Sequence, residues 1–414
     1  MTHRRDFLKA SLAGTGLVTW GLSVPRFLAR TAAAAPNADK AGARDTILVV
    51  VELTGGNDGL NTVVPFKDPE YAKLRPTLKL PETQLKKLND EIALHPQLSG
   101  LADLYHEGAL AVLQGVGYPN PTQSHFDSMD IWQAATTGKV RTEGWIGKAL
   151  KGMLPASPTF HIKNANEKSP LALEGAPVRA PSIASLEEFQ LQMAAASGAD
   201  KQQQRDVIEG AVKGGDKTPG LLEFVSRTAA NTYASSRRLQ EIGKNYQPKA
   251  AYPQQFALAN RLKLAAQLID ADIGSRIFYV ALDGFDTHSA QAPQHSLLML
   301  QLSTALTAFY KDLAARGHKD RLLIMTFSEF GRRVKENGSR GTDHGSAAPM
   351  FLLGGKVKGG VVGKHPSLTD VPMGNLQHHT DFRQVYAAVL EKWLGVDSTP
   401  VLGGKYEPVD VLKA

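Results

Sequence analysis

Side chains that handle metal ions and protons recur along this 414-residue sequence, each close to an apolar segment. They are Asp58, Ser124, His125, Asp286, His288, Glu329, Arg332, Asp343 and His344. Carboxylates and neutral imidazoles are the ligands that zinc, manganese or iron can use when thiolates are missing, and this sequence has no cysteine. The residue types therefore predict a site for a divalent metal ion.

The acidic and imidazole residues of the C-terminal half have the spacing of metal ligands. Asp286 and His288 are two residues apart, so on extended backbone their side chains project from the same face and can share one ion. Glu329 directly follows an apolar segment, and Asp343 and His344 close a loop rich in Gly, Ser, Asn and Arg. We expect these five residues to be metal ligands.

A second group of residues has the chemistry of catalysis on an anionic ester. Ser124 stands before "HFDSMDIWQAATTG", which has helical character, so its hydroxyl meets the positive end of a helix, where phosphate-like anions bind. Beside a divalent cation such a serine can act as a nucleophile. Arg332 can hold the non-bridging oxygens of a phosphoryl or sulfuryl group, and His125 belongs with these catalytic candidates.

Each candidate also has a purely structural interpretation. Asp58, in "GGNDG", can shape a turn, Ser124 can cap a helix, and His125 can support that cap. Asp343 can belong to a capped bend, and Arg332 can be a solvated charge.

The segments between the candidates alternate between strand-like and helix-like patterns. Continuous apolar, β-branched runs predict buried strands at 46–53, 109–116, 276–282, 321–327 and 348–353. Helical spacing is found at 95–108, 255–271 and 297–317. This alternation predicts an α/β fold, a doubly wound and mainly parallel sheet with helices on both sides. In such sheets ligands bind beyond the carboxyl ends of the strands, where the candidates lie.

The N-terminus has the features of a twin-arginine export signal. The Arg4–Arg5 pair precedes a mildly apolar run and a small-residue tract, which predicts a signal over residues 1–35, cleaved near Ala34 or Ala35. The apolar run is shorter than the ~20 residues of a bilayer span, so we expect no permanent membrane anchor. The expected partner is the twin-arginine translocase and the expected location is the periplasm or another exported compartment.

Net charge argues against nucleic acid as a partner. The chain carries +7, but residues 1–35 contribute +4 of that, so the predicted mature protein carries +3. No dense Lys/Arg stripe with interleaved aromatic residues accompanies it.

The predicted mature chain divides into unequal parts. Residues 36–45 are expected to be a flexible N-terminus, and residues 46–414 to form the α/β domain. Residues 182–252, rich in Gln, Ala, Lys and Glu, differ from the rest and are expected to be a helical insertion, with a disordered linker as the alternative.

Several motifs together resemble one bacterial family. They are "VVVELTGGNDGLNTVVP", "YAKLRPTLKL", "GVGYPNPTQSHFDSMDIW", "GFDTHSAQ", "TFSEFGRRVKENGSRGTDHGSAAPMFLLGG" and "DFRQVYAAVLEKWLG". The sequence closely resembles the twin-arginine-exported family labelled domain of unknown function 1501, over nearly the whole predicted mature chain. That family looks related to the alkaline phosphatase and sulfatase superfamily, which implies an αβα sandwich with a metal site at the strand ends.

The resemblance also implies roles for individual residues. Asp58 is similar to the N-terminal metal aspartate, and Ser124 to the nucleophile. The central Asp/His pair, the later acidic ligand and the last histidine ligand correspond to Asp286 with His288, Glu329 and His344.

This sequence departs from the superfamily pattern at two places. Asp286 and His288 are two residues apart where the superfamily usually has four, and Phe330 stands where a histidine follows the acidic ligand. These departures argue against a full two-metal site, so one ion, or none, is an alternative to two. The Cys/Ser-x-Pro-x-Arg motif of sulfatases is not found at "SHFDS", which favours phosphate esters over sulfates.

The expected function is an exported metal-dependent hydrolase of phosphate or related anionic esters, with a serine nucleophile. Zn²⁺ is the expected ion, with Mn²⁺ or Ca²⁺ as alternatives. A second hypothesis is a catalytically inactive envelope protein of the same fold that binds polysaccharide or a partner protein.

A third hypothesis is a serine esterase of the GDSL type, suggested by "GGNDG". It is disfavoured because only the predicted signal lies upstream of that block, and because no Gly-x-Ser-x-Gly elbow is found. The remaining histidines, His161 among them, occur singly and are expected to have structural or exposed roles.

Overall fold

The computed structural model describes residues 46–153, 159–164, 167–177, 180–185 and 241–413. The chain divides into two compact units, and the larger one comprises Ala43–Ser182, Gln247–Ala266 and Ser275–Ala414. Every candidate site residue belongs to this larger unit. The predicted signal, the predicted flexible N-terminus and most of the predicted insertion lie outside the described residues.

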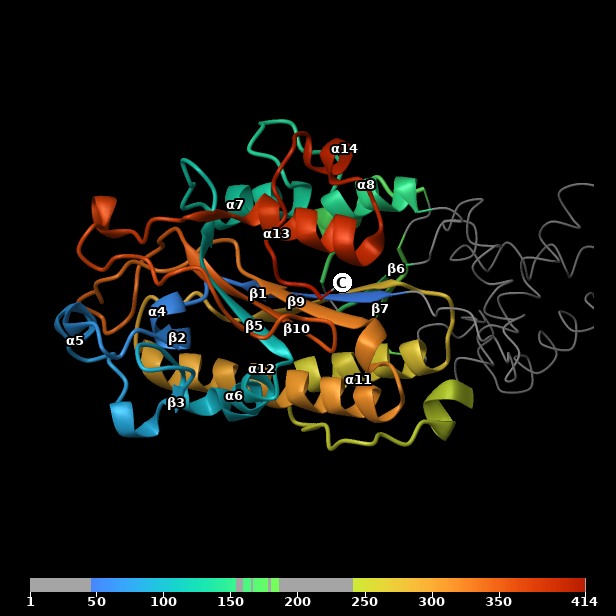
Figure 1. The fold of residues 1–414 in the computed structure, drawn as a ribbon, viewed down its shortest axis with the longest axis horizontal. Coiled ribbons are helices and arrows are strands. Elements are labelled where there is room, and N and C mark those ends of the chain that lie inside the picture. Colours follow the sequence, from blue (N-terminus) through green and yellow to red (C-terminus); the bar gives the residue numbers. More distant parts are fainter. Residues whose placement is uncertain (1–45, 154–158, 165–166, 178–179, 186–240, 414) are drawn as a thin grey trace, which may run out of the picture. The chain divides into compact units, whose positions relative to one another are not determined.

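Three parallel strands form the centre of the sheet in the larger unit (Figure 1). They are β1 (Ile47–Thr54), β8 (Ile277–Asp283) and β9 (Leu322–Phe327). β1 lies between the other two, so that Val50 is opposite Tyr279 on one side and Met325 on the other. All three strands are buried along nearly their whole length, as their continuous apolar sequences predict.

The remaining strands extend the sheet in the order β11-β5-β10-β9-β1-β8-β6. Their bounds are β5 (Leu110–Gly117), β6 (Thr159–Ile162), β10 (Ala348–Gly354) and β11 (Gly360–Val362). A further short strand, β12 (Thr380–Asp381), pairs with β5. The two residues of β7 (Ser182–Ile183) belong to different units. β10 is antiparallel to both β9 and β5, whereas β11 is parallel to β5. As a result, β1, β5, β8 and β9 all end at one edge of the sheet, and the loop before β10 returns to that edge.

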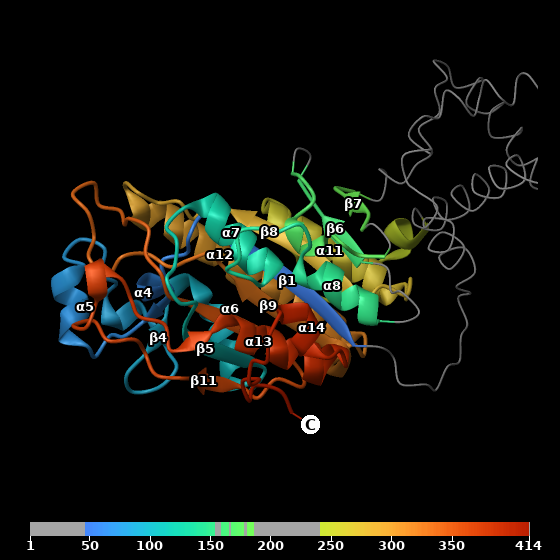
Figure 2. The ribbon, with the colours of Figure 1, turned by 90° about the horizontal axis from the view of Figure 1, so that it is seen from above.

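Helices cover both faces of the sheet. The α-helices are α4 (Gly59–Thr62), α5 (Pro69–Leu74), α6 (Ser99–His106), α7 (His125–Ala134), α8 (Trp145–Gly152), α11 (Ala257–Asp270), α12 (Gln291–Ala315), α13 (Phe382–Ala388) and α14 (Ser398–Leu402). Figure 1 shows α7, α8, α13 and α14 on one face, with α6 and α12 on the other. Figure 2 looks onto the first face and shows the same four helices spread over the sheet. The predicted αβα sandwich with a mainly parallel sheet is thereby confirmed.

Short elements complete the described chain. A small antiparallel sheet contains β2 (Val63–Val64), β3 (Lys86–Lys87) and β4 (Ala93–Leu94). The 3₁₀ turns are η1 (Glu82–Gln84), η2 (Pro96–Leu98), η3 (Leu171–Leu173), η5 (Lys319–Arg321) and η6 (Pro372–Gly374), and a π-helical turn, η7 (Val389–Leu394), continues α13. None of the helices in the described part of the chain has the length and apolarity that a bilayer span requires.

Aromatic stacking fixes α7 on the sheet. Trp132 stacks on Phe327 of β9, with ring centroids 5.6 Å apart, and on Phe382 of α13 at 4.3 Å. Its side chain is almost fully buried, and truncating a buried tryptophan to alanine typically costs about 3–5 kcal/mol. This packing holds the start of α7 at the edge where the strands end.

Candidate metal centre

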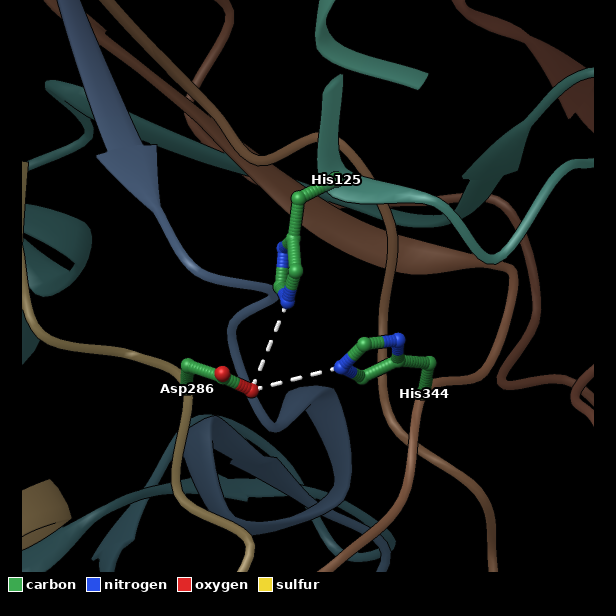
Figure 3. A group of neighbouring side chains, drawn as sticks. All are labelled: His125, Asp286 and His344. Atoms are coloured by element: carbon green, nitrogen blue, oxygen red, sulfur yellow. Dashed lines mark hydrogen bonds and ion pairs between the residues drawn. The ribbon is translucent and has the colours of Figure 1, made fainter. Parts of the chain in front are cut away.

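Four side chains converge at the carboxyl edge of the sheet. His125 is the first residue of α7, Asp286 and His288 lie in the loop after β8, and His344 lies in the loop before β10. His125, Asp286 and His344 each offer one ligand atom, and these three atoms all lie within 4.8 Å of one another (Figure 3). Asp286 Oδ1 is 3.4 Å from His125 Nε2, 3.0 Å from His288 Nε2 and 3.3 Å from His344 Nε2.

The far nitrogen of each imidazole ring faces a protein acceptor. His125 Nδ1 lies 2.8 Å from Glu329 Oε1, and His344 Nδ1 lies 2.8 Å from the Gln123 carbonyl oxygen. His288 Nδ1 lies 3.4 Å from Asp343 Oδ1. Because carbonyl and ionised carboxylate oxygens only accept, these contacts place the proton on Nδ1 of each ring. Nε2 of each ring is then left with its lone pair beside Asp286, as in histidine metal sites with an outer acceptor.

The residues fit a divalent cation. His125 Nε2 is buried and has no hydrogen-bond partner, because its 3.4 Å approach to Asp286 lacks hydrogen-bonding geometry. His288 Nε2 and His344 Nε2 are 2.8 Å apart, and two neutral lone pairs at that distance require a shared proton or a cation. Three imidazoles and one carboxylate form a donor set that zinc accepts.

Arg332 holds Asp286 in its ionised form. Although burial works to raise the pKa of Asp286, the hydrogen bond and charge of Arg332 bring that pKa to about 2. Arg332 Nη2 donates to Asp286 Oδ1 at 2.7 Å, and the Arg332 backbone forms an antiparallel bridge with His344. The carboxylate is therefore charged throughout the physiological range.

Arg332 is not placed to hold a substrate. Its Nε donates to the Gly56 carbonyl at 2.7 Å, Nη1 donates to Thr342 at 2.8 Å, and Nη2 also donates to the carbonyls of Gly55 and Phe285. Its side chain is fully buried. The sequence predicts an anion-binding guanidinium, but the structure shows one that ties the loop after β1 to the loop after β8.

Glu329 and Asp343 lie behind the cluster. The Glu329 side chain is fully buried, and its Oε1 accepts hydrogen bonds from the Gly55 amide at 2.9 Å as well as from His125. That hydrogen bond from His125 is the main cause that raises the pKa of His125, whereas burial lowers the pKa of His344. Glu329 and Asp343, predicted as ligands, are placed as the groups that orient His125 and His288.

Phe330 forms an apolar wall beside the imidazoles. Its ring centroid lies 4.8 Å from that of His125 and 4.9 Å from that of His344. Gly56 has a φ of +77°, and a Cβ there would lie 2.5 Å from the Phe330 ring. This close approach explains why glycine stands in the turn after β1.

Asp58 lies apart from the cluster in a buried ion pair. Arg75 Nη1 and Nη2 donate to its two oxygens at 2.6 and 2.9 Å, and Gln291 donates a further hydrogen bond. Both charged side chains are fully buried. Burial works to raise the pKa of Asp58, but Arg75 outweighs it and the pKa is lowered. The structure thus places the predicted N-terminal ligand in a buried ion pair that joins the N-cap of α4 to the C-cap of α5.

Ser124 stands at the rim of the centre. It is the N-cap of α7, is exposed, and accepts a hydrogen bond from the Asp127 amide at a long 3.5 Å. The residues on either side, Gln123 and His125, both contact the cluster.

A family model matches residues 45–403, almost the whole described chain. The chain belongs to that family, DUF1501, described as protein of unknown function. No curated protein matches the sequence.

Solved structures similar to this DUF1501 chain have low identity to it. PsFucS1 sulfatase from Pseudoalteromonas sp. has a TM-score of 0.41 and 12% identity, covering 93% of this chain and 75% of its own. A protein in the alkaline phosphatase superfamily from Vibrio parahaemolyticus has a TM-score of 0.40 and 9% identity, covering 93% and 78%. A mutant of alkaline phosphatase PafA has a TM-score of 0.33 and 11% identity, covering 70% and 64%.

Some residues that build the candidate site or support it carry no sequence signal. Gln123 acts through its main-chain carbonyl, which any residue supplies. Arg75 is an isolated arginine before a proline, and nothing local indicates that it is buried against Asp58.

Proposed function

We propose that this DUF1501 protein is an exported, metal-dependent hydrolase of phosphate or related anionic esters. The observation that supports it most is the convergence of His125, Asp286 and His344 from three separate segments of the chain, with one nitrogen of each imidazole facing the Asp286 carboxylate. About half of the side-chain surface of Asp286 and of His288 is exposed, at 49% and 44%, so a ligand at this point can be reached from solvent.

His125, Asp286, His288 and His344 would hold the ion, with zinc the expected one and manganese or calcium as alternatives. A bound divalent ion would polarise the ester and offset its negative charge. The single cluster favours one ion, because Asp58 is engaged by Arg75 and Phe330 supplies no ligand.

Ser124 is the proposed nucleophile. Its hydroxyl lies at the positive end of α7, which favours anionic groups, and its cap bond is long enough to leave the oxygen weakly held. The Ser124 Oγ–phosphorus bond would form as the bond to the leaving alkoxide breaks, and the hydroxyl proton would depart with the alcohol. Water would then hydrolyse the phosphoserine and restore the hydroxyl.

The backbone amides of the first turn of α7 would meet the charge of the substrate. These amides, rather than Arg332, would stabilise that charge, because the donors of Arg332 are bonded to protein oxygens. Residues 1–35 would direct the folded chain to the twin-arginine translocase.

An ester panel tests the proposal. Phosphomonoesters, phosphodiesters and sulfate esters would be offered to the full chain with Zn²⁺, Mn²⁺ or Ca²⁺, beside a His344→Ala variant. We expect a phosphate ester to be hydrolysed by the native chain only. Equal rates for the two proteins, or no turnover on any ester, would contradict it.

A second candidate function, binding of an envelope polysaccharide or a partner protein without catalysis, is favoured by one observation. The ligand set is reduced relative to the superfamily pattern by the Asp58–Arg75 pair. Ser124→Ala separates the two, because a hydrolase loses turnover and a binding protein keeps its affinity.

A further inference from the structure

A second group of side chains with catalytic chemistry lies on β6, on β7 and in the loop after β6, and shares no residue with the metal centre. His161 Nδ1 is 2.9 Å from Ser182 Oγ, and His161 Nε2 is 3.0 Å from Glu167 Oε1. The His161 side chain is fully buried, whereas Ser182 is half-buried. Serine, histidine and glutamate thus form one hydrogen-bonded chain.

Glu167 sets the tautomer of His161. Its Oε2 accepts the Asn164 amide at 2.9 Å and lies 3.5 Å from Arg261 Nη1. Burial works to raise the pKa of Glu167, but these partners and His161 lower it, so the carboxylate is ionised. An ionised carboxylate only accepts, which places the ring proton on Nε2 and leaves Nδ1 as the acceptor for the Ser182 hydroxyl.

The backbone holds the histidine rigidly. The His161 amide donates to the Pro181 carbonyl at 2.9 Å, which ties β6 to the residue before Ser182. On its other side His161 pairs in register with Tyr279 of β8. A base so fixed between a hydroxyl and a carboxylate has the defining relation of a serine hydrolase triad.

We propose that Ser182, His161 and Glu167 form a nucleophilic centre, independent of metal, that cleaves uncharged carboxylic esters. The substrate class follows from charge. Arg261 is the cation in contact with the group, but it is 5% exposed and directed at Glu167. In the described part of the chain no other Lys or Arg forms an ion pair with Ser182, His161 or Glu167, so these three residues hold no paired cation that faces the nucleophile.

The proposed reaction balances with water as the co-reactant. Ser182 Oγ bonds to the carbonyl carbon while its proton passes to His161 Nδ1. The alcohol leaves as its bond to that carbon breaks, and it takes the proton from Nδ1. Water then attacks the acyl-serine by the same proton route, releasing the acid and restoring Ser182.

A fluorophosphonate probe on the full chain tests the proposal, with labelled peptides identified by mass spectrometry. We expect labelling at Ser182, lost in Ser182→Ala and unchanged in Ser185→Ala, a matched control three residues along the chain. Glu167→Gln, which keeps the shape of the side chain, should slow labelling by about 100-fold or more. Circular dichroism would confirm that each variant is folded.

Two further readouts separate this centre from the proposed metal-dependent function. Labelling and hydrolysis of p-nitrophenyl acetate should persist in a chelator and in His344→Ala. Native protein whose Ser182 labels no faster than Ser185, or whose labelling rate is unaffected by Glu167→Gln, would overturn the proposal, whatever the metal centre does.

Discussion

Individual acceptor groups orient the imidazoles of the candidate metal centre. His125 is oriented by the carboxylate of Glu329, His288 by that of Asp343, and His344 by a main-chain carbonyl. Each acceptor fixes a tautomer, and so determines which nitrogen remains available for a ligand.

Replacing Glu329 by glutamine tests this arrangement. The amide has the size of the carboxylate but not its charge, so the hydrogen bond that orients His125 loses its charge assistance. We expect the affinity for zinc to fall by about 10- to 100-fold, measured by competition with a chromophoric chelator. Glu143→Gln, an exposed carboxylate paired with Lys151, is the matched control. Equal affinity in both variants would contradict the assigned role.

The buried pair of Asp58 and Arg75 makes a prediction about stability. Arg75→Met leaves the Asp58 carboxylate without its counter-charge in a fully buried position. We expect a loss of about 3–5 kcal/mol in the free energy of unfolding, measured with urea, and unchanged metal content in the folded protein. If the variant instead loses its metal and keeps its stability, Asp58 would be a metal ligand rather than half of a structural ion pair.

At the start of helix α7, Ser124 is both the N-cap of the helix and the proposed nucleophile. Ser124→Asn keeps a side chain that caps helices well, whereas Ser124→Ala removes the cap at about 1 kcal/mol. Since neither side chain can be phosphorylated, we expect both variants to lose ester turnover, with only the alanine variant less stable. Turnover that survives in Ser124→Asn would show that the hydroxyl is not the nucleophile.

β1 contains a buried carboxyl that makes stability depend on pH. Burial raises the pKa of Glu52 to about 7, even though Tyr279, Thr54 and Gln133 all donate hydrogen bonds to it. Below pH 4.5 the group is protonated in both the folded and unfolded states. As pH rises toward about 7, the unfolded chain releases its proton first, and the free energy of unfolding falls.

We expect Glu52→Gln to remove that fall. Between pH 5 and pH 8 the native chain should lose about 2–3 kcal/mol that the variant retains, measured by urea unfolding at both values. Glu143→Gln serves again as control, because its carboxylate is exposed. Parallel pH profiles for native protein and Glu52→Gln would contradict a raised pKa for Glu52.

The larger unit as a whole shows why its fold was more predictable than its site. The five apolar runs became β1, β5, β8, β9 and β10 because burial of a strand on both faces leaves a local signature. The direction of β10 left no such signature in the sequence. Because β10 runs antiparallel to β5 and β9, the loop that carries His344 returns to the edge where the other strands end.

Site residues were predictable where their chemistry is local. The Asp286–His288 spacing and the position of His344 indicated a cluster that the structure does bring together. The partner of Asp58, the acceptors of Arg332 and the chain from Ser182 to Glu167 are set by distant segments. Sequence spacing carries no information on such contacts.

The central claim, that His125, Asp286, His288 and His344 form a divalent-metal centre, is tested most directly by elemental analysis of the folded protein. We predict about one ion per chain, with zinc foremost, and its loss in His125→Ala with the fold retained. Native protein without metal, or a His125→Ala variant with the full native content, would contradict the claim.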